Sequence, residues 1–584
     1  MKTETTSKEA RLEFFRELYE RARLAHREAD DGYERNLEQY RGSKKIDGSP
    51  EEALTVRNVT YEIIESQVSS EIPMPKVDPE AYSEIRDRNA HSIEMLCTAI
   101  RDKLPFEEMN DVDERNTYVF GGGVWLVEWD NALIRGGEIG GVRVHTVSPR
   151  DFIPEPCVCS IEDMEYCFIR TRRTRGDVSR KYAVDEGELS LLECESSYSE
   201  EDSPDDTVAV TVCFYRGEDG EVGRFIFSGE VTLSDMPAYY RRRLEKCERC
   251  GRPVAECLCD ECRPSVEEIE REEVHLSAKR IGEIFGGGSG RRDARVSVPY
   301  YLPKSFPIVI RKNVSLDGEL FGQSDCEYVR PEQQAINKIE SRILQKLLRA
   351  GITPIIPEDA TIALNNTVFG QVIKMKPGES ADMYGKVDTT PDISQDIAEA
   401  ERLYDHTKRV MGISDAFQGI DNAAGESGYA KQLRISQAQG RLESKRRMKK
   451  AAYAALYRLI FEHYLAFADE PRQLYYKDVL GNVHVEEFNR HDFLIFDGKR
   501  GELVYDDGYL FSSDSSGEEY QREALWERNL ENLRSGSLGD PALPATLLRY
   551  WQSQERAHYP YARENVEYFR AVISDEIKNG KEQI

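Results

Sequence analysis

The chain changes from a glycine-rich to a helical pattern along Asp317-Gly-Glu-Leu-Phe-Gly-Gln-Ser324-Asp-Cys-Glu-Tyr-Val-Arg-Pro331-Glu-Gln-Gln-Ala-Ile-Asn337-Lys-Ile-Glu-Ser341. Apolar side chains then recur at helical spacing. They are Ile336, Ile339, Ile343, Leu344, Leu347 and Leu348. Because proline suits the first turn of a helix and glycine suits its exit, we expect a helix from Pro331 to Arg349, closed by Gly351.

The segments that follow alternate between short strands and longer helices. Residues 352–384 contain short β-like pieces among Pro, Gly and Asn residues. Ser394 can cap a second helix that reaches Met411. A loop at 412–428 precedes the longest predicted helix, 429–468, which spans about 60 Å at about 1.5 Å per residue. Gly440 inside this helix marks a predicted kink or break.

The flanking regions combine helices with strands. We expect helices at 8–39, 51–70 and 79–101, with another reaching about 118. The β-type run Val124–Trp129 and the returning strand Val142–Val147 bracket a hairpin turn. Further strands are expected at 166–170, 207–215 and 223–227, short strands at 473–505, and helices from 517 to about 579. The predicted fold class is therefore α+β.

The overall charge excludes some classes of protein. The 584 residues include 79 Lys and Arg against 107 Asp and Glu, a net charge of −28. A chain this acidic does not coat nucleic acid with its whole surface, so any contact with DNA needs a local basic patch. No apolar run approaches the roughly 20 residues of a membrane span, and we expect neither a membrane anchor nor a secretory signal.

The charge is unevenly distributed along the chain. Residues 185–206 hold ten acidic side chains and no basic one, which is typical of a solvated loop. Residues 431–450 hold eight basic side chains and one acid, Glu443. Such a helix repels itself unless an anion lies nearby, and the anion is either an acidic neighbouring subunit or nucleic acid phosphate. A simple solvated face is the third interpretation.

Five of the twelve cysteines cluster between Cys247 and Cys262. Two C-x-x-C pairs can present four thiolates to a structural Zn²⁺ at about 2.3 Å each. The most economical ligand set is Cys247, Cys250, Cys259 and Cys262, with Cys257 able to replace Cys259. Reduced free thiols and redox chemistry are the competing interpretations.

Catalytic signatures are missing from the sequence. The nine histidines are scattered, and none lies in an H-E-x-x-H motif. There is also no G-x-S-x-G elbow and no kinase signature set. We therefore expect no enzyme activity and assign no catalytic residue.

From Pro307 onward the order of parts resembles the portal proteins of tailed bacteriophages, in particular the long-tailed type. In portal proteins of this type, the segment that leads into a stem helix contains G-x-S followed by Pro, Asn and Ser. The stretch from Asp317 to Ser341 is similar to that segment. Gln418-Gly-Ile-Asp-Asn-Ala-Ala-Gly-Glu-Ser427-Gly428-Tyr-Ala430-Lys431 resembles the tunnel loop and its following helix. Phe120–Asp130 and Val147–Pro154 resemble the wing. The likeness covers roughly residues 50–470, and the acidic insert and the cysteines depart from it.

The resemblance implies a head–tail connector with an α/β wing, a helical stem, a small β-containing clip, a long kinked helix and a helical C-terminal crown. It divides the chain into these segments: helices and wing 1–310, with the acidic insert 185–206 and a zinc knuckle 245–264; wing exit and first stem helix 311–350; clip 351–393; second stem helix 394–411; tunnel loop 412–428; long helix 429–468; wing-completing strands 469–515; crown 516–584.

The resemblance also implies partners and sites. A homo-oligomeric ring of about twelve subunits would surround double-stranded DNA at one capsid vertex of the virion, after assembly in the bacterial cytoplasm. The implied partners are the terminase large subunit, the major capsid and scaffold proteins, and a tail adaptor. The residues expected near DNA are Gln418, Asn422, Glu426, Ser427, Lys431 and Arg434. Those expected at the terminase-docking clip are Pro354, Glu358, Asn365 and Lys374.

A second hypothesis is a zinc-containing nucleic-acid-binding or scaffold protein unrelated to capsids. It accounts for the cysteines and the basic stretch. It does not account for the order of helix, clip, helix, loop and long helix. A metal-dependent hydrolase, the third hypothesis, lacks an open ligand set.

Overall fold

The structure is a computed structural model with a mixed α+β fold. It describes residues 7–46, 52–81, 83–135, 137–185, 187–194, 207–247, 249, 264–285, 292–349, 352–355, 363–367, 370–374, 385–388, 391–413, 428–477, 483–514, 519–556, 559, 562, 565–566 and 568–573; side chains of 352–388 and 428–441 lie outside the description. Within these ranges, no helix combines the length and the apolar character that crossing a membrane requires.

A five-stranded antiparallel sheet forms one side of the body, with strand order β4-β5-β6-β7-β8. Its strands are β4 (Phe152–Pro154), β5 (Tyr166–Thr174), β6 (Thr207–Arg216), β7 (Val222–Ser228) and β8 (Val231–Met236). Helix α1 (Lys8–Tyr40) packs on one face, where Phe15 stacks on Phe225 with ring centroids 4.4 Å apart. Buried residues run almost continuously along β6 and β7, so both faces of the sheet are covered, and the second face packs on another sheet.

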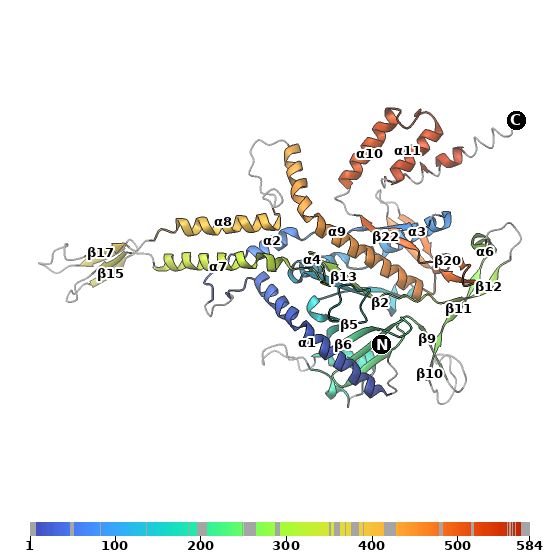
Figure 1. The fold of residues 1–584 in the computed structure, drawn as a ribbon, viewed down its shortest axis with the longest axis horizontal. Helices are drawn as coiled ribbons and strands as arrows, with labels where there is room; N and C mark the ends of the chain where they lie inside the picture. Colours follow the sequence, from blue (N-terminus) through green and yellow to red (C-terminus); the bar gives the residue numbers. More distant parts are fainter. Residues whose placement is uncertain are drawn as a thin grey trace.

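That second sheet is three-stranded, with order β13-β2-β3. Its strands are β2 (Gly122–Arg135), β3 (Glu138–Val147) and β13 (Ile308–Lys312). Its far face carries Trp125 and Val127 against helix α9 (Gly428–Phe467), whose apolar half is buried from Tyr453 onward. Helix α3 (Glu84–Lys103) packs on α9, so the two sheets lie face to face between α1 on one side and α9 with α3 on the other (Figure 1).

Three successive glycines let helix α4 (Phe106–Phe120) and β2 approach their neighbours closely. Gly121 ends α4 in the left-handed region with φ 87°, and a Cβ there would lie 2.0 Å from the carbonyl oxygen of Gly322. A Cβ on Gly123 would lie 2.0 Å from Asp113 Oδ1. Only glycine fits both positions, because each approach leaves no room for a side chain.

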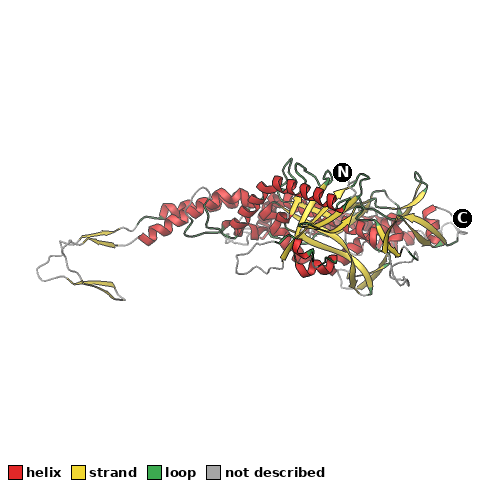
Figure 2. Cartoon of the chain, turned by 90° about the horizontal axis from the view of Figure 1, so that it is seen from below, coloured by secondary structure: helices red, strands yellow, loops and turns green. Residues whose placement is uncertain are grey.

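Two helices form an arm that leaves the body. Helix α7 (Asp325–Arg349) runs outward and α8 (Ser394–Met411) returns beside it, with Arg342 and Lys346 both pairing with Asp396. The far end carries the strand pairs β14 (Ile352–Ile355) with β17 (Gly385–Asp388), and β15 (Ala363–Thr367) with β16 (Gly370–Lys374). Viewed from below, the arm again extends away from the body (Figure 2).

The remaining elements surround this frame. They are α2 (Val59–Gln67), β1 (Met74–Pro79), α5 (Arg175–Tyr182), β9 (Arg242–Cys247), β10 (Pro264–Ile269), β11 (Arg271–Leu276), α6 (Ala278–Phe285), β12 (Ala294–Pro299), β18 (Arg472–Lys477), β19 (Val483–Phe488), β20 (Leu494–Asp497), β21 (Glu502–Tyr505), β22 (Tyr509–Asp514), α10 (Glu519–Arg534) and α11 (Pro544–Arg556). Helices α10 and α11 stand beside each other at the edge of the body (Figure 1).

The α+β class and most of the longer elements agree with the sequence analysis. The predicted helix at 8–39, the strands around 124–129 and 207–215, and the long helix at 429–468 are all present within one or two residues of their expected ends, except that the strand at 124–129 extends over 122–135. Helix α9 is one continuous helix with a clear change of direction (Figure 1), as expected for a kink rather than a break. Part of the acidic stretch, 187–194, packs on the five-stranded sheet through the buried Leu192, and 195–206 lie outside the described residues.

Three predicted helix starts were wrong. Helix α2 begins at Val59 rather than Glu51, because the Asn58 side chain accepts a hydrogen bond from the Tyr61 N–H and caps it there. Helix α7 begins six residues before Pro331, because the Ser324 hydroxyl accepts from the Cys326 N–H at 3.0 Å. Helix α3 begins at Glu84 rather than 79, because the Ser83 hydroxyl accepts from the Arg86 N–H at 3.1 Å. Helix α8 has the expected bounds, although Asp392 and not Ser394 accepts the N–H at its start.

Replacing Gly121 by alanine tests the close approach of α4 to the 322 turn. Gly137 is the matched control, because its φ is 89° but no atom lies within 4 Å of a Cβ there. We expect G137A to lower the free energy of unfolding by about 1 kcal/mol from left-handed strain alone. G121A should lower it by about 3 kcal/mol, since strain adds to a clash with backbone. Urea denaturation measures both, and equal losses would contradict the packing described.

The pH dependence of stability should include a contribution from His463 on α9. Its ring is fully buried and its Nδ1 lies 2.7 Å from the Leu459 carbonyl oxygen, and burial lowers its pKa from 6.5 to about 4. Between these values the unfolded chain binds a proton that the folded chain does not. His463 therefore leaves stability intact above pH 6.5 and lowers it as the pH falls toward 4.

At pH 5 this contribution amounts to about 2 kcal/mol. The variant H463Q should show that much less loss of unfolding free energy between pH 7.5 and 5 than the parent chain does. H275Q is the control, because His275 is exposed on β11. If H463Q and the parent lose the same amount, the buried histidine does not titrate as described.

Candidate functional site

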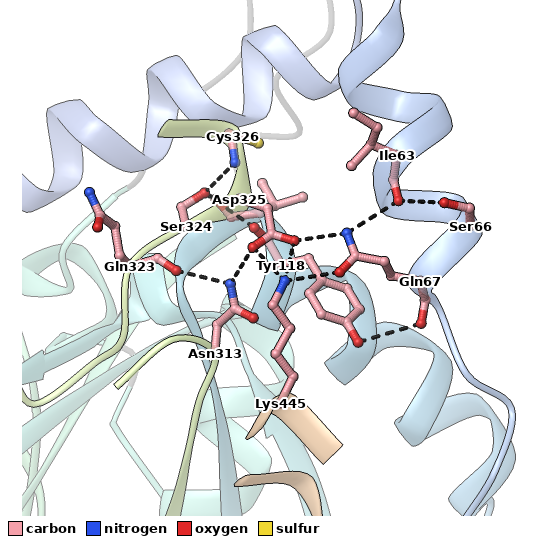
Figure 3. A network of polar contacts seen from close by, with 11 residues as sticks. Ile63, Ser66, Gln67, Tyr118, Asn313, Gln323, Ser324, Asp325, Cys326 and Lys445 are labelled. Atoms are coloured by element: carbon pink, nitrogen blue, oxygen red, sulfur yellow. Dashed lines mark hydrogen bonds and ion pairs between the residues drawn. The ribbon is translucent and has the colours of Figure 1, made fainter. Parts of the chain in front are cut away.

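A buried carboxylate marks the point where the arm joins the body. Asp325 is the first residue of α7 and its side chain is 1% exposed. Lys445 of α9 contacts both of its oxygens, at 2.6 and 2.8 Å (Figure 3). Asn313 and Gln67 donate to the same carboxylate at 2.8 and 2.9 Å. Four donor–acceptor contacts thus hold one carboxylate between α2, α9 and the segment after β13.

Neighbouring groups complete this network, which we call the Asp325 junction. The Gln67 side-chain oxygen accepts from Lys445 at 2.9 Å, and the Lys445 ammonium lies 5.0 Å from the centre of the Tyr118 ring. The Tyr118 hydroxyl donates to the Gln67 backbone oxygen at 3.4 Å. Figure 3 shows these side chains converging from separate elements. The Asp325 carboxylate is satisfied within the chain, and together with the Lys445 ammonium it carries no net charge.

A second buried network lies one helical turn further along α9. Arg311 of β13 contacts Asp113 at 2.7 Å and Glu114 at 2.6 Å, and Lys449 contacts Glu114 at 3.0 Å. Each of these four side chains is at most 8% exposed. Two cations and two carboxylates therefore neutralise one another inside the protein, as burial of charge requires.

The electrostatics of this quartet follow from its burial. Burial raises the pKa of Asp113 despite the adjacent Arg311. Burial also opposes the charge of Glu114, but Arg311 and Lys449 outweigh it and hold the pKa of Glu114 below its ordinary value. Burial lowers the pKa of Lys449, with Glu114 acting against the shift. Glu114 is thus the anionic centre of the quartet.

These contacts identify an anion that the sequence analysis did not consider. The basic stretch was expected to face a neighbouring subunit, nucleic acid or solvent. For Lys445 and Lys449 the partners are Asp325 and Glu114 of the same chain. Arg447 is exposed and pairs with Glu443 one turn before it. Only part of the basic stretch is therefore available to an external anion.

The residues expected near DNA lie mostly outside the description. Gln418, Asn422, Glu426 and Ser427 are outside the described residues. Lys431 and Arg434 lie in the first turns of α9, and their side chains are outside the description. The structure thus describes the helix backbone that carries the last two.

The expected clip residues lie at the far end of the arm. Pro354 is on β14 and pairs with Lys386 of β17, while Asn365 and Lys374 lie on the β15–β16 hairpin. Glu358 lies outside the described residues. The three described positions therefore share the end of the arm furthest from the body (Figure 1).

Of the five clustered cysteines, the structure describes Cys247. Cys247 is buried at the end of β9, and Cys250, Cys257, Cys259 and Cys262 lie outside the described residues. Cys247 pairs with Pro264 at the start of β10, so the two ends of the cysteine segment are adjacent. That closure fits two C-x-x-C pairs facing one ion. Elsewhere in the described ranges, no three His, Cys, Asp or Glu side chains are grouped as metal ligands.

Sequence reasoning did not single out Asp325, Asp113, Glu114 or Arg311. Asp325 lies within the stretch Asp317 to Ser341. The chain has 107 acidic residues, and nothing in the local sequence indicates which of them forms a buried ion pair. No protein-family model matches the chain, and no curated protein is significantly similar to it.

Removing the Lys445 ammonium tests the Asp325 junction. K445M should lower the free energy of unfolding by about 3 kcal/mol, because it leaves a buried carboxylate unpaired. R447M is the matched control, since Arg447 lies two residues away with a side chain that is 73% exposed, and we expect a loss below about 0.5 kcal/mol.

Chemical denaturation of both variants measures the difference. The double variant D325N/K445M should recover part of the loss, because an amide replaces the stranded charge. Equal stabilities of K445M and R447M would show that the junction does not hold the arm to the body.

Proposed function

We propose that this chain is a portal subunit of a tailed bacteriophage, which assembles into a ring at one capsid vertex and lets double-stranded DNA pass through its centre. The observation that carries the proposal is the order of elements around the arm. Helix α7 leaves the body, small strand pairs lie at its tip, α8 returns, and the 40-residue α9 passes back through the body. This is the stem, clip, stem and long-helix order of the resemblance.

Exposed apolar side chains on the arm support assembly with further copies. On α7, Leu347 and Leu348 are 50% and 73% exposed; on α8, Ile397 and Val410 are 46% and 54% exposed. Exposed apolar side chains gathered on one helical pair are typical of a surface that another protein covers. A head-to-tail contact repeated around an axis closes into a ring.

The negative net charge of the chain suits a channel that lets DNA pass better than it suits a protein that binds DNA tightly. Strong phosphate contacts along a channel would hinder sliding, and their strength would fall steeply with salt. The net charge is −28, and two lysines of the basic stretch are neutralised internally. An acidic wall with few available cations would let a polyanion pass.

The proposal also assigns a partner or a role to each of the other segments. The loop 412–428 is the segment proposed nearest DNA, and the arm's tip is the proposed docking site for the terminase large subunit. The wing would meet the capsid and scaffold proteins, and a tail adaptor would bind the assembled connector. Zn²⁺ on Cys247, Cys250, Cys259 and Cys262 would brace the β9–β10 hairpin, and no catalytic role is proposed. A zinc-containing nucleic-acid-binding protein would leave the arm unexplained.

Native mass spectrometry of the purified chain tests the proposal. We expect a closed oligomer of about twelve copies, and we expect L348E to convert it to smaller species because a charge replaces an apolar contact. L24E is the matched control: Leu24 is also 73% exposed and helical, but it lies on α1, away from the arm.

A monomer of the parent chain at micromolar concentration would contradict the proposed ring. Equal dissociation by L348E and L24E would instead show that the arm is not the contact between subunits.

A further inference from the structure

A cavity of about 310 Å³ lies between the segment that follows α2 and the middle of α9. Residues 66–71 form one wall, Glu114 and Tyr118 of α4 contribute to its lining, and Arg311 reaches it from β13. A water molecule in the liquid takes about 30 Å³, so the cavity has room for about ten. This is more space than bridging waters need, and it lies at the lower bound of typical ligand pockets.

Cations dominate the lining of this cavity. Five basic side chains line it: Arg311, Lys445, Arg446, Lys449 and Lys450. Glu71 and Glu114 are the acids in the same lining. Lys445 and Lys449 are already neutralised by Asp325 and Glu114. An anion in the cavity would still lie among more cations than carboxylates.

One cationic side chain at the cavity is not paired within the described part of the chain. The Lys445 ammonium is fully engaged by Asp325 and Gln67. In contrast, the half-buried Arg446 guanidinium forms no ion pair with any described residue. A guanidinium without a carboxylate partner can donate charge-assisted hydrogen bonds to an oxyanion.

We propose that this cavity binds a single phosphate group, either as free orthophosphate or as the terminal phosphate of a nucleotide. A tetrahedral oxyanion can accept from the Arg446 guanidinium at the cavity wall, and arginine forks suit phosphate oxygens. The carboxylates of Glu71 and Glu114 disfavour a longer polyphosphate, because they add negative charge to the same space. The bound group would join α9 to the 66–71 segment. This inference does not rest on the proposed function.

Isothermal titration of the full-length chain with orthophosphate tests the site, at constant ionic strength in a chloride buffer. We expect saturable binding of one phosphate per chain. R446Q should weaken it about tenfold, because it removes a charged fork from the anion. R446K should lie between the two, since it keeps the charge but not the fork. R447Q is the control, because Arg447 does not line the cavity.

A parallel titration with deoxyadenosine 5′-monophosphate separates the two sources of the group. Tighter binding than orthophosphate assigns the site to a nucleotide, and equal or weaker binding assigns it to the free ion. Arg446 has no described ion-pair partner to lose, so R446Q should fold, which circular dichroism verifies. Absence of saturable binding below about 10 mM for both probes, or equal weakening by R446Q and R447Q, would overturn the proposal.

Discussion

The buried contact between Asp325 and Lys445 is the constraint on which the arrangement of the chain depends. Asp325 starts the outgoing helix of the arm, and Lys445 lies in the long helix that returns to the body after the arm. Because both charges are withdrawn from water, each must keep its partner, and this fixes α7 against α9. Gln67 and Asn313 tie the same carboxylate to α2 and to the segment after β13. Four parts of the chain thus meet at one side chain.

This junction also explains how a very acidic chain contains a dense basic stretch. Lys445 and Lys449 pair with the buried carboxylates of Asp325 and Glu114. Part of the local positive charge is therefore neutralised inside the protein. The neighbouring positions 446 and 447 are not used in this way: one lines a cavity and the other faces solvent. Successive residues of a helix point in different directions, and the stretch therefore divides into a structural face and faces open to other partners.

Much of the fold could be predicted from local pattern, and the junctions could not. A continuous run of apolar, β-type residues around Trp125 predicted a strand, and helical periodicity predicted α1 and α7. Helix starts failed where a side chain such as Asn58 or Ser324 capped the backbone earlier or later than proline or propensity suggested. The pairs Asp325–Lys445 and Arg311–Glu114 join residues 120 and about 200 positions apart, and no local spacing encodes such contacts. The expected DNA-facing residues stay predictions.

The chain combines an arm with exposed apolar side chains, a body of stacked sheets and helices, and a net charge of −28. We propose that copies of this chain close into a ring around a channel that a DNA duplex can pass. Electron microscopy of the purified full-length protein tests this proposal. We expect end-on views of closed rings with a central opening wide enough for a DNA duplex, and side views in which the arms gather at one end. Particles of single chains, or open filaments without a channel, would contradict it.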